Sequence, residues 1–248
     1  MRGIWSWVGP SGYEGFELAE GIMKQTILFS NIENDIFDIS SVDKCKFYEV
    51  MAQKLRDVIS SDSKLIYIPA PLWEGVEDRF FETIRMCFKK AGINFSKIER
   101  LLPNSKVDLT SISDDTVLFL MGGSPLSQMK FIKDNSLIEM IKNHQGPVIG
   151  FCAGAINLSK YSIITSDDDF PEPQSYQGIG RVDISVEPHF VADDSEFVKN
   201  RVKEINGFAH QYNTKIYVIP DDGFIYCEGD NIEKFGDIVE FGGNDDEK

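Results

Sequence analysis

The sequence has few of the features that mark nucleic-acid-binding and membrane proteins. Its 25 Lys and Arg residues are outnumbered by 40 Asp and Glu residues, which gives a formal net charge of −15. No apolar run approaches the roughly 20 residues of a membrane-spanning helix, and residues 1–22 lack the apolar centre of a signal peptide. We therefore expect a cytoplasmic protein with no nucleic-acid or membrane partner.

Cysteine and histidine are also scarce, with four and three residues respectively. The cysteines form no C-x-x-C pair and lie near no histidine at metal-ligand spacing. The acidic run 167–169 does not follow the spacing of a calcium loop. We expect no metal and no cofactor, and free thiols at all four cysteines in a reducing compartment.

The regular feature of the chain is an alternation of short apolar runs with amphipathic stretches. The apolar runs predict strands at 26–30, 64–70, 116–123 and 147–151, and the amphipathic stretches predict helices at 43–59, 76–91, 126–143 and 153–160. The rest of the chain adds a strand at 180–188, a helix at 194–205 and strands at 215–219, 224–228 and 237–241. This alternation predicts an α/β fold with a doubly wound, mostly parallel sheet.

The predicted elements divide the chain into one domain and two flanking segments. Residues 23–241 form the domain, residues 1–22 an N-terminal extension, and residues 242–248 an acidic tail. The aromatic residues of the extension fit either a layer that covers the domain or the interface of a homodimer.

Cys152 lies between a predicted strand and a predicted helix, in the sequence Gly-Phe-Cys-Ala-Gly. This is the pattern of a nucleophile elbow, a strained turn that exposes a catalytic side chain. Gly150 and Gly154 fit that turn because larger side chains there would collide with the neighbouring strand and helix. The motif alone fits an activated thiolate and a buried core thiol about equally well.

Two other segments contain candidate partners for Cys152. Backbone amides of Gly122 and Gly123, in a turn that ends a predicted strand, and of Ala153 could bind an oxyanion. His189 follows a strand and is the best placed of the three histidines to act as a base. One of the Asp residues at 167–169 could orient its ring, although a solvated acidic loop explains at least two of them.

Taken in order, these motifs resemble the dipeptidase E / cyanophycinase family of peptidases. The similarity covers residues 23–241 and is strongest over 117–190. It implies a flavodoxin-like fold of the class I glutamine amidotransferase type. It also implies a catalytic triad of Cys152 and His189 with Asp169, or with Asp168 if the loop carries an insertion. The residues implied to bind the oxyanion and substrate are Gly122, Gly123 and Ser124, together with Ala153 of the elbow.

The chain departs from the family pattern at three places. Cys152 stands where relatives carry serine, and Ser124-Pro125 replaces a third glycine and the residues after it. Members that act on aspartyl dipeptides carry an arginine in the helix after the histidine, where this chain has Val198, with Lys199 and Arg201 nearby.

These features predict a hydrolase that cleaves a small peptide or amide through an acyl-enzyme on Cys152. One alternative is a glutaminase-type amidotransferase, but that chemistry needs a histidine followed two residues later by glutamate, and this pair is missing here. The other alternative is a binding or regulatory protein that kept the elbow after losing its activity.

Overall fold

The structure is a computed structural model that describes residues 24–31, 48–71, 76–102, 112–193 and 195–242. The predicted N-terminal extension and nearly all of the acidic tail lie outside the described residues. So does the first part of the predicted helix 43–59. No helix in the described ranges is long and apolar enough to cross a membrane.

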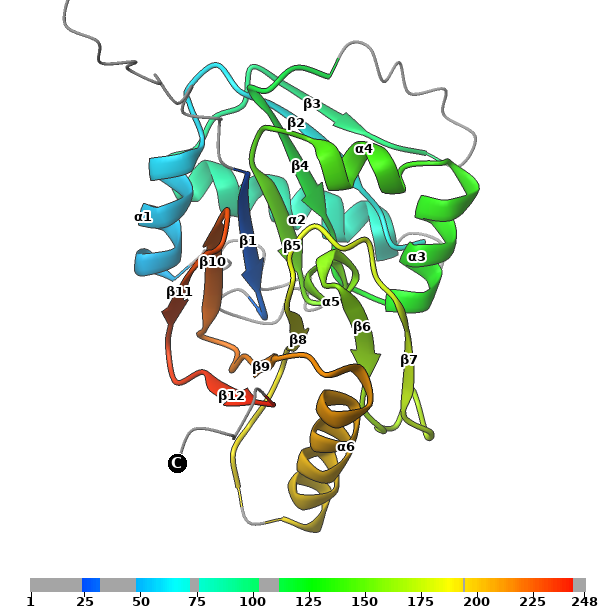
Figure 1. Ribbon diagram of the computed structural model, residues 1–248. Coiled ribbons are helices and arrows are strands. Elements are labelled where there is room, and N and C mark those ends of the chain that lie inside the picture. Colours follow the sequence, from blue (N-terminus) through cyan, green and yellow to red (C-terminus); the bar gives the residue numbers. More distant parts are fainter. Residues whose placement is uncertain (1–23, 32–47, 72–75, 103–111, 194, 243–248) are drawn as a thin grey trace, which may run out of the picture.

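A seven-stranded sheet forms the centre of the molecule (Figure 1), in the order β11-β10-β1-β5-β4-β2-β3. Its strands are β1 (Gln25–Phe29), β2 (Lys64–Ile68), β3 (Lys97–Arg100), β4 (Thr116–Leu120), β5 (Val148–Phe151), β10 (Phe224–Glu228) and β11 (Asn231–Phe235). The five strands from β1 to β3 in this order run parallel, whereas β10 and β11 are antiparallel to their neighbours. The predicted mostly parallel α/β sheet is therefore confirmed.

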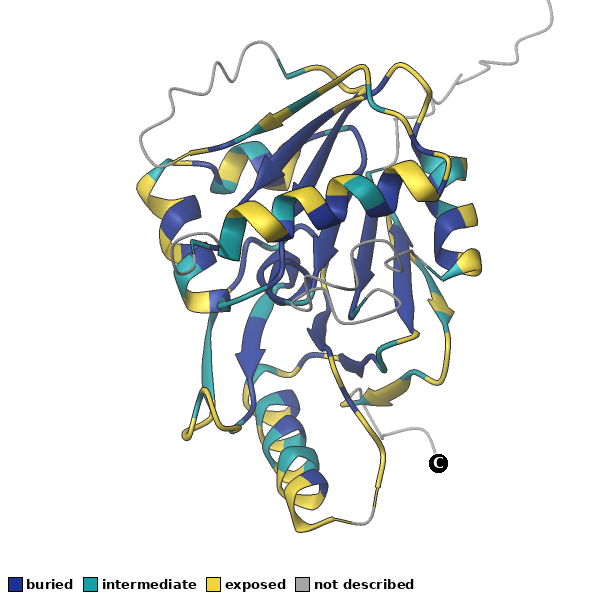
Figure 2. Ribbon diagram, turned by 180° about the vertical axis from the view of Figure 1, so that it is seen from behind, coloured by how far each residue is buried: buried dark blue, intermediate teal, exposed yellow. Residues whose placement is uncertain are grey.

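Helices cover both faces of this sheet, because its central strands are apolar on both sides. Alternate residues such as Phe29 and Phe119 pack against α1 (Glu49–Val58) and α2 (Val76–Lys90) on one face. Leu28 and Leu118 face α3 (Pro125–Asp134), α4 (Ile138–Asn143) and α5 (Ala153–Leu158) on the other. Figure 2 shows the resulting pattern, with buried central strands between helices that are buried on one side only.

A smaller layer lies beyond the carboxyl ends of the parallel strands (Figure 1). It contains a three-stranded sheet of β8 (Ser185–Glu187), β9 (Ile216–Val218) and β12 (Val239–Phe241). A two-stranded sheet joins β6 (Tyr161–Ile164) to β7 (Gln174–Gln177). The long helix α6 (Glu196–Tyr212) packs its apolar side against this layer. The catalytic candidates lie where this layer meets the central sheet.

Several predicted boundaries are wrong. The helix predicted at 126–143 is two helices, α3 and α4, which are separated near Ser136, where φ is 55°. The strand predicted at 180–188 is limited to β8, and the helix predicted to end at 205 continues to Tyr212. Strands β3, β7 and β11 were not predicted, because they are short and carry polar residues on exposed or half-buried positions. Strand β6 was not predicted, because it is only four residues long and closely follows α5. Cys87 is disulfide-bonded, whereas Cys152 and Cys227 are free, so the expectation of four free thiols is also wrong.

The structure confirms the steric reason for the two glycines of the elbow. A Cβ atom added at Gly150 would lie 2.7 Å from the backbone nitrogen of Ala155 in α5. One added at Gly154 would lie 2.3 Å from the carbonyl oxygen of Leu120 in β4. Both neighbours are backbone atoms of a helix or a strand, so moving either of them would distort regular structure at a cost in free energy.

We predict that Gly154→Ala lowers the free energy of unfolding by about 1–3 kcal/mol, the usual cost of overpacking a core. The matched control is Gly207→Ala, because Gly207 lies in α6 with no atom within 4 Å of an added Cβ. That control should raise the free energy of unfolding by about 0.5–1 kcal/mol. Urea denaturation of both variants measures the difference, and equal effects would contradict the close packing at Gly154.

Candidate active site

Cys152 occupies a strained turn between β5 and α5. Its φ of 49° and ψ of −108° are rare for a residue with a side chain. Its N–H group donates a hydrogen bond to the carbonyl of Phe29 at 2.9 Å, which ties the turn to the end of β1. The Cys152 side chain is partly exposed and lines a cavity of about 280 Å³. The elbow geometry that the glycine pattern predicts is therefore present.

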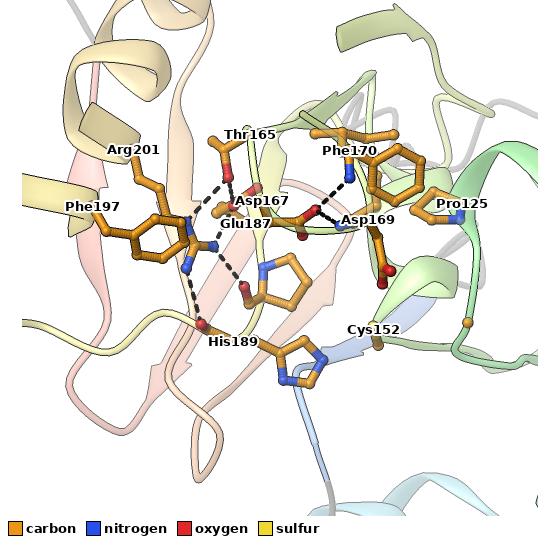
Figure 3. Close-up of a pocket in the computed structure, with 14 residues that line it drawn as sticks. Pro125, Cys152, Thr165, Asp167, Asp169, Phe170, Glu187, His189, Phe197 and Arg201 are labelled. Carbon is orange, nitrogen blue, oxygen red and sulfur yellow. Dashed lines mark hydrogen bonds and ion pairs between the residues drawn. The ribbon is translucent and has the colours of Figure 1, made fainter. Parts of the chain in front are cut away.

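His189 reaches the same cavity from the loop that follows β8. Its φ is also positive, at 55°, and its N–H group donates to Ser30 Oγ at 2.7 Å. Its Nδ1 atom lies 2.6 Å from Asp221 Oδ1. Figure 3 shows the ring of His189 directed toward Cys152, so the imidazole lies between a carboxylate and a thiol.

The partners of His189 determine its charge. Partial burial acts to lower the pKa of the imidazole, but the hydrogen bond to Asp221 and the interactions with Cys152 raise it to about 10. The same bond to His189 lowers the pKa of the Asp221 carboxyl, against the opposing effect of burial. The ring therefore stays protonated near neutral pH.

Ser30, at the end of β1, connects the two groups. Its hydroxyl accepts the backbone N–H of His189 and donates to Asp221 Oδ1 at 3.3 Å. The residue is fully buried. Ser30 thus holds both the loop of His189 and the carboxylate that pairs with the ring.

The carboxylate beside His189 is not the one expected from the sequence. Asp169 and Asp167 line the cavity, but the ring bonds to Asp221 and not to Asp168 or Asp169. One carboxylate oxygen of Asp167 accepts the N–H groups of Asp169 and Phe170, which shapes the acidic loop. Asp221 lies in a Pro-Asp-Asp-Gly turn after β9, which sequence reasoning interprets only as a turn. Its proximity to His189 arises because β9 pairs with β8.

The residues expected to bind an oxyanion lie in different surroundings, and not all of them face the cavity. Gly123, with φ of 121°, lines the cavity. Gly122 is buried, and a Cβ atom there would lie 2.9 Å from the ring of Phe151. The Ser124 side chain accepts a hydrogen bond from the N–H of Ser127 and so caps α3. Ala153 is the first residue of α5, where the N–H groups have no intrahelical carbonyl partner.

The far wall of the cavity carries an ion pair that was not predicted. Arg201, on α6, bonds to Glu187 Oε1 at 2.5 Å, and both side chains are largely buried. Thr165 donates to the same carboxylate oxygen at 2.5 Å. Burial raises the pKa of Glu187, while Arg201 and Thr165 act to lower it. Figure 3 shows this group across the cavity from Cys152.

Comparison with known proteins gives matches in both sequence and fold. The sequence profile of "Peptidase family S51" matches residues 38–235. A peptidase E from Nostoc sp. is 26% identical over 185 residues, which cover 71% of this chain and 74% of the relative. A peptidase E from Haemophilus influenzae is 26% identical over 46% of this chain and 52% of its own length.

A solved structure is also similar in fold. The crystal structure of a putative peptidase E protein from Listeria monocytogenes EGD-e superposes with a TM-score of 0.57 at 16% identity. The superposition covers 86% of this chain and 98% of that one.

We predict that Asp221→Asn lowers the pKa of His189 from about 10 toward its ordinary value of 6.5, because the ring loses its negative partner. The matched control is Asp169→Asn, which removes a carboxylate that is not bonded to the ring. Titration of the His189 ring by NMR measures both pKa values, and an unchanged pKa in Asp221→Asn would contradict the pairing.

The raised pKa of His189 also predicts a pH dependence of stability. Because the folded pKa exceeds the unfolded one, its contribution is complete below about pH 6.5 and is lost as pH rises through about 10. Wild type should therefore lose stability over this interval more steeply than Asp221→Asn. Thermal unfolding of the two proteins between pH 6 and 10 checks the difference.

Proposed function

This chain belongs to peptidase family S51, and from that premise we propose that it hydrolyses a small peptide or amide through an acyl-enzyme on Cys152. The observation that supports the proposal is the position of the His189 ring, which is hydrogen-bonded to Asp221 and directed toward the thiol of Cys152 (Figure 3). A nucleophile, a base and an orienting carboxylate in this order form the arrangement that acyl transfer requires.

In the first step, the Cys152 sulfur attacks the scissile carbonyl carbon. The negative charge that develops on the carbonyl oxygen is stabilised by the backbone amides of Gly123 and Ala153. Protonated His189 then donates its proton to the leaving amine as the carbon–nitrogen bond breaks. The product of this step is a thioester on Cys152 and a free amine.

In the second step, water attacks the thioester. Neutral His189 accepts a proton from this water, and the carbon–sulfur bond breaks to release the carboxylic acid. Asp221 keeps its charge throughout and holds the ring in the orientation that both transfers need. Asp169, which the family resemblance assigns to the triad, stands at the cavity wall and is proposed to contact substrate.

Cys227 provides a natural comparison for the reactivity of Cys152. It is buried, and burial raises the pKa of its thiol to about 12. We predict that a small alkylating reagent at neutral pH modifies Cys152 at least about tenfold faster than Cys227, because Cys152, unlike Cys227, is accessible and faces a cationic ring. Mass spectrometry of the native protein measures both rates, and equal rates would contradict activation of Cys152.

We further predict that Cys152→Ala abolishes hydrolysis of a panel of dipeptides and acyl amides, a loss of at least about 10³-fold. Cys227→Ala, which removes a thiol distant from the cavity, should keep the wild-type rate. Hydrolysis that persists undiminished in Cys152→Ala would reject Cys152 as the nucleophile. A wild-type protein that is inactive on every member of the panel would favour the non-enzymatic alternative.

A further inference from the structure

The charges that line the cavity are unequal. Among the described residues of its wall, Arg201 alone carries a permanent positive charge, while Asp167, Asp169 and Glu187 are acidic. The protonated ring of His189 adds a second positive charge. The wall therefore carries more negative than positive charge, which favours cations.

The charge of Arg201 is already neutralised. One terminal nitrogen bonds to Glu187, Nε donates to Thr165 Oγ1 at 3.1 Å, and the other terminal nitrogen donates to the carbonyl of His189 at 3.2 Å. A substrate carboxylate could bind this guanidinium only in competition with the buried Glu187. An anionic side chain would also lie near three carboxylates, and like charges in a binding site oppose binding.

The acidic loop on the opposite wall offers a group that fits a cation. The Asp169 side chain is exposed and forms no ion pair within the described part of the chain. Phe197 lines the cavity beside Arg201 on α6, with the guanidinium carbon 5.7 Å from its ring centre, so it belongs to the wall that faces Asp169. A free carboxylate such as that of Asp169 binds ammonium and guanidinium ions through charge-assisted hydrogen bonds.

We propose that this site selects substrates in which the residue that supplies the scissile carbonyl has a positively charged side chain. Asp169 binds that charge, and Glu187 excludes acidic side chains by neutralising Arg201. Asp169 and Glu187 are thus specificity-determining residues of the reaction, and the assignment rests on the proposed peptidase function.

Four dipeptides that differ only in the side chain of the first residue test the selection. Lysine and norleucine form one pair, which differs by a charge at similar length, and glutamate and glutamine form the other. We expect kcat/KM to be at least about tenfold higher for lysine than for norleucine, and at least about tenfold lower for glutamate than for glutamine. All four carry the same free amino group, so that group cannot cause the difference.

Two variants assign the effect to residues. Asp169→Asn should reduce the preference for lysine over norleucine to less than about threefold, chiefly by lowering kcat/KM for the lysine peptide. Glu172→Gln is the matched control, because it removes one charge from the same loop outside the cavity wall; it should keep the full preference. Glu187→Gln frees Arg201 and should raise cleavage of the glutamate peptide, relative to the glutamine peptide, by at least about tenfold.

The outcomes separate this inference from the function on which it rests. Cleavage of the norleucine and glutamine peptides that disappears in Cys152→Ala, with no preference for lysine over glutamate, overturns the inference alone. Failure of the wild type to cleave any of the four overturns the proposed function as well. If Glu187→Gln does not fold, as judged by thermal unfolding, then Asp169→Asn and the wild-type panel decide the question.

Discussion

The turn at Cys152 is the constraint on which the rest of the site depends. A residue with a side chain adopts a positive φ there, and the backbone of α5 lies in close contact with β4 and β5. This is possible only because Gly150 and Gly154 have no side chains at the two points of closest approach. The hydrogen bond from Cys152 to Phe29 then fixes the turn against β1. The cost of the strained backbone is offset by this surrounding core, and the thiol is held at the edge of the cavity.

The second half of the site depends on polar contacts between distant parts of the chain. His189 also has a positive φ, and Ser30 at the end of β1 holds its backbone. The same hydroxyl contacts Asp221, so one buried residue at the end of β1 orders both loops, which follow the paired strands β8 and β9. The nucleophile thus comes from the central sheet, and the base and its carboxylate come from the smaller layer. The pairing of β8 with β9 brings together the two loops that carry His189 and Asp221.

Much of the fold could be predicted because the central strands have a strong signal. The runs at β2 and β4 are apolar at nearly every position, as strands covered on both faces must be. The missed strands lack that signal: β3, with the sequence Lys-Ile-Glu-Arg, alternates exposed and half-buried residues at the edge of the sheet. The break between α3 and α4 was missed because apolar residues continue through it at near-helical spacing, while Ser136 takes a backbone conformation that a helix cannot contain.

The sequence by itself determined the elbow, its two glycines, the α/β alternation and the candidacy of Cys152 and His189. Each of these is encoded within a few neighbouring residues. The tertiary structure alone decided that Asp221, rather than an aspartate of the run 167–169, pairs with His189. It also decided that Arg201 reaches the cavity already bonded to Glu187. The physical reason is that hydrogen bonds and ion pairs depend on distances between residues far apart in the chain, and only the packing of β8, β9 and α6 sets those distances.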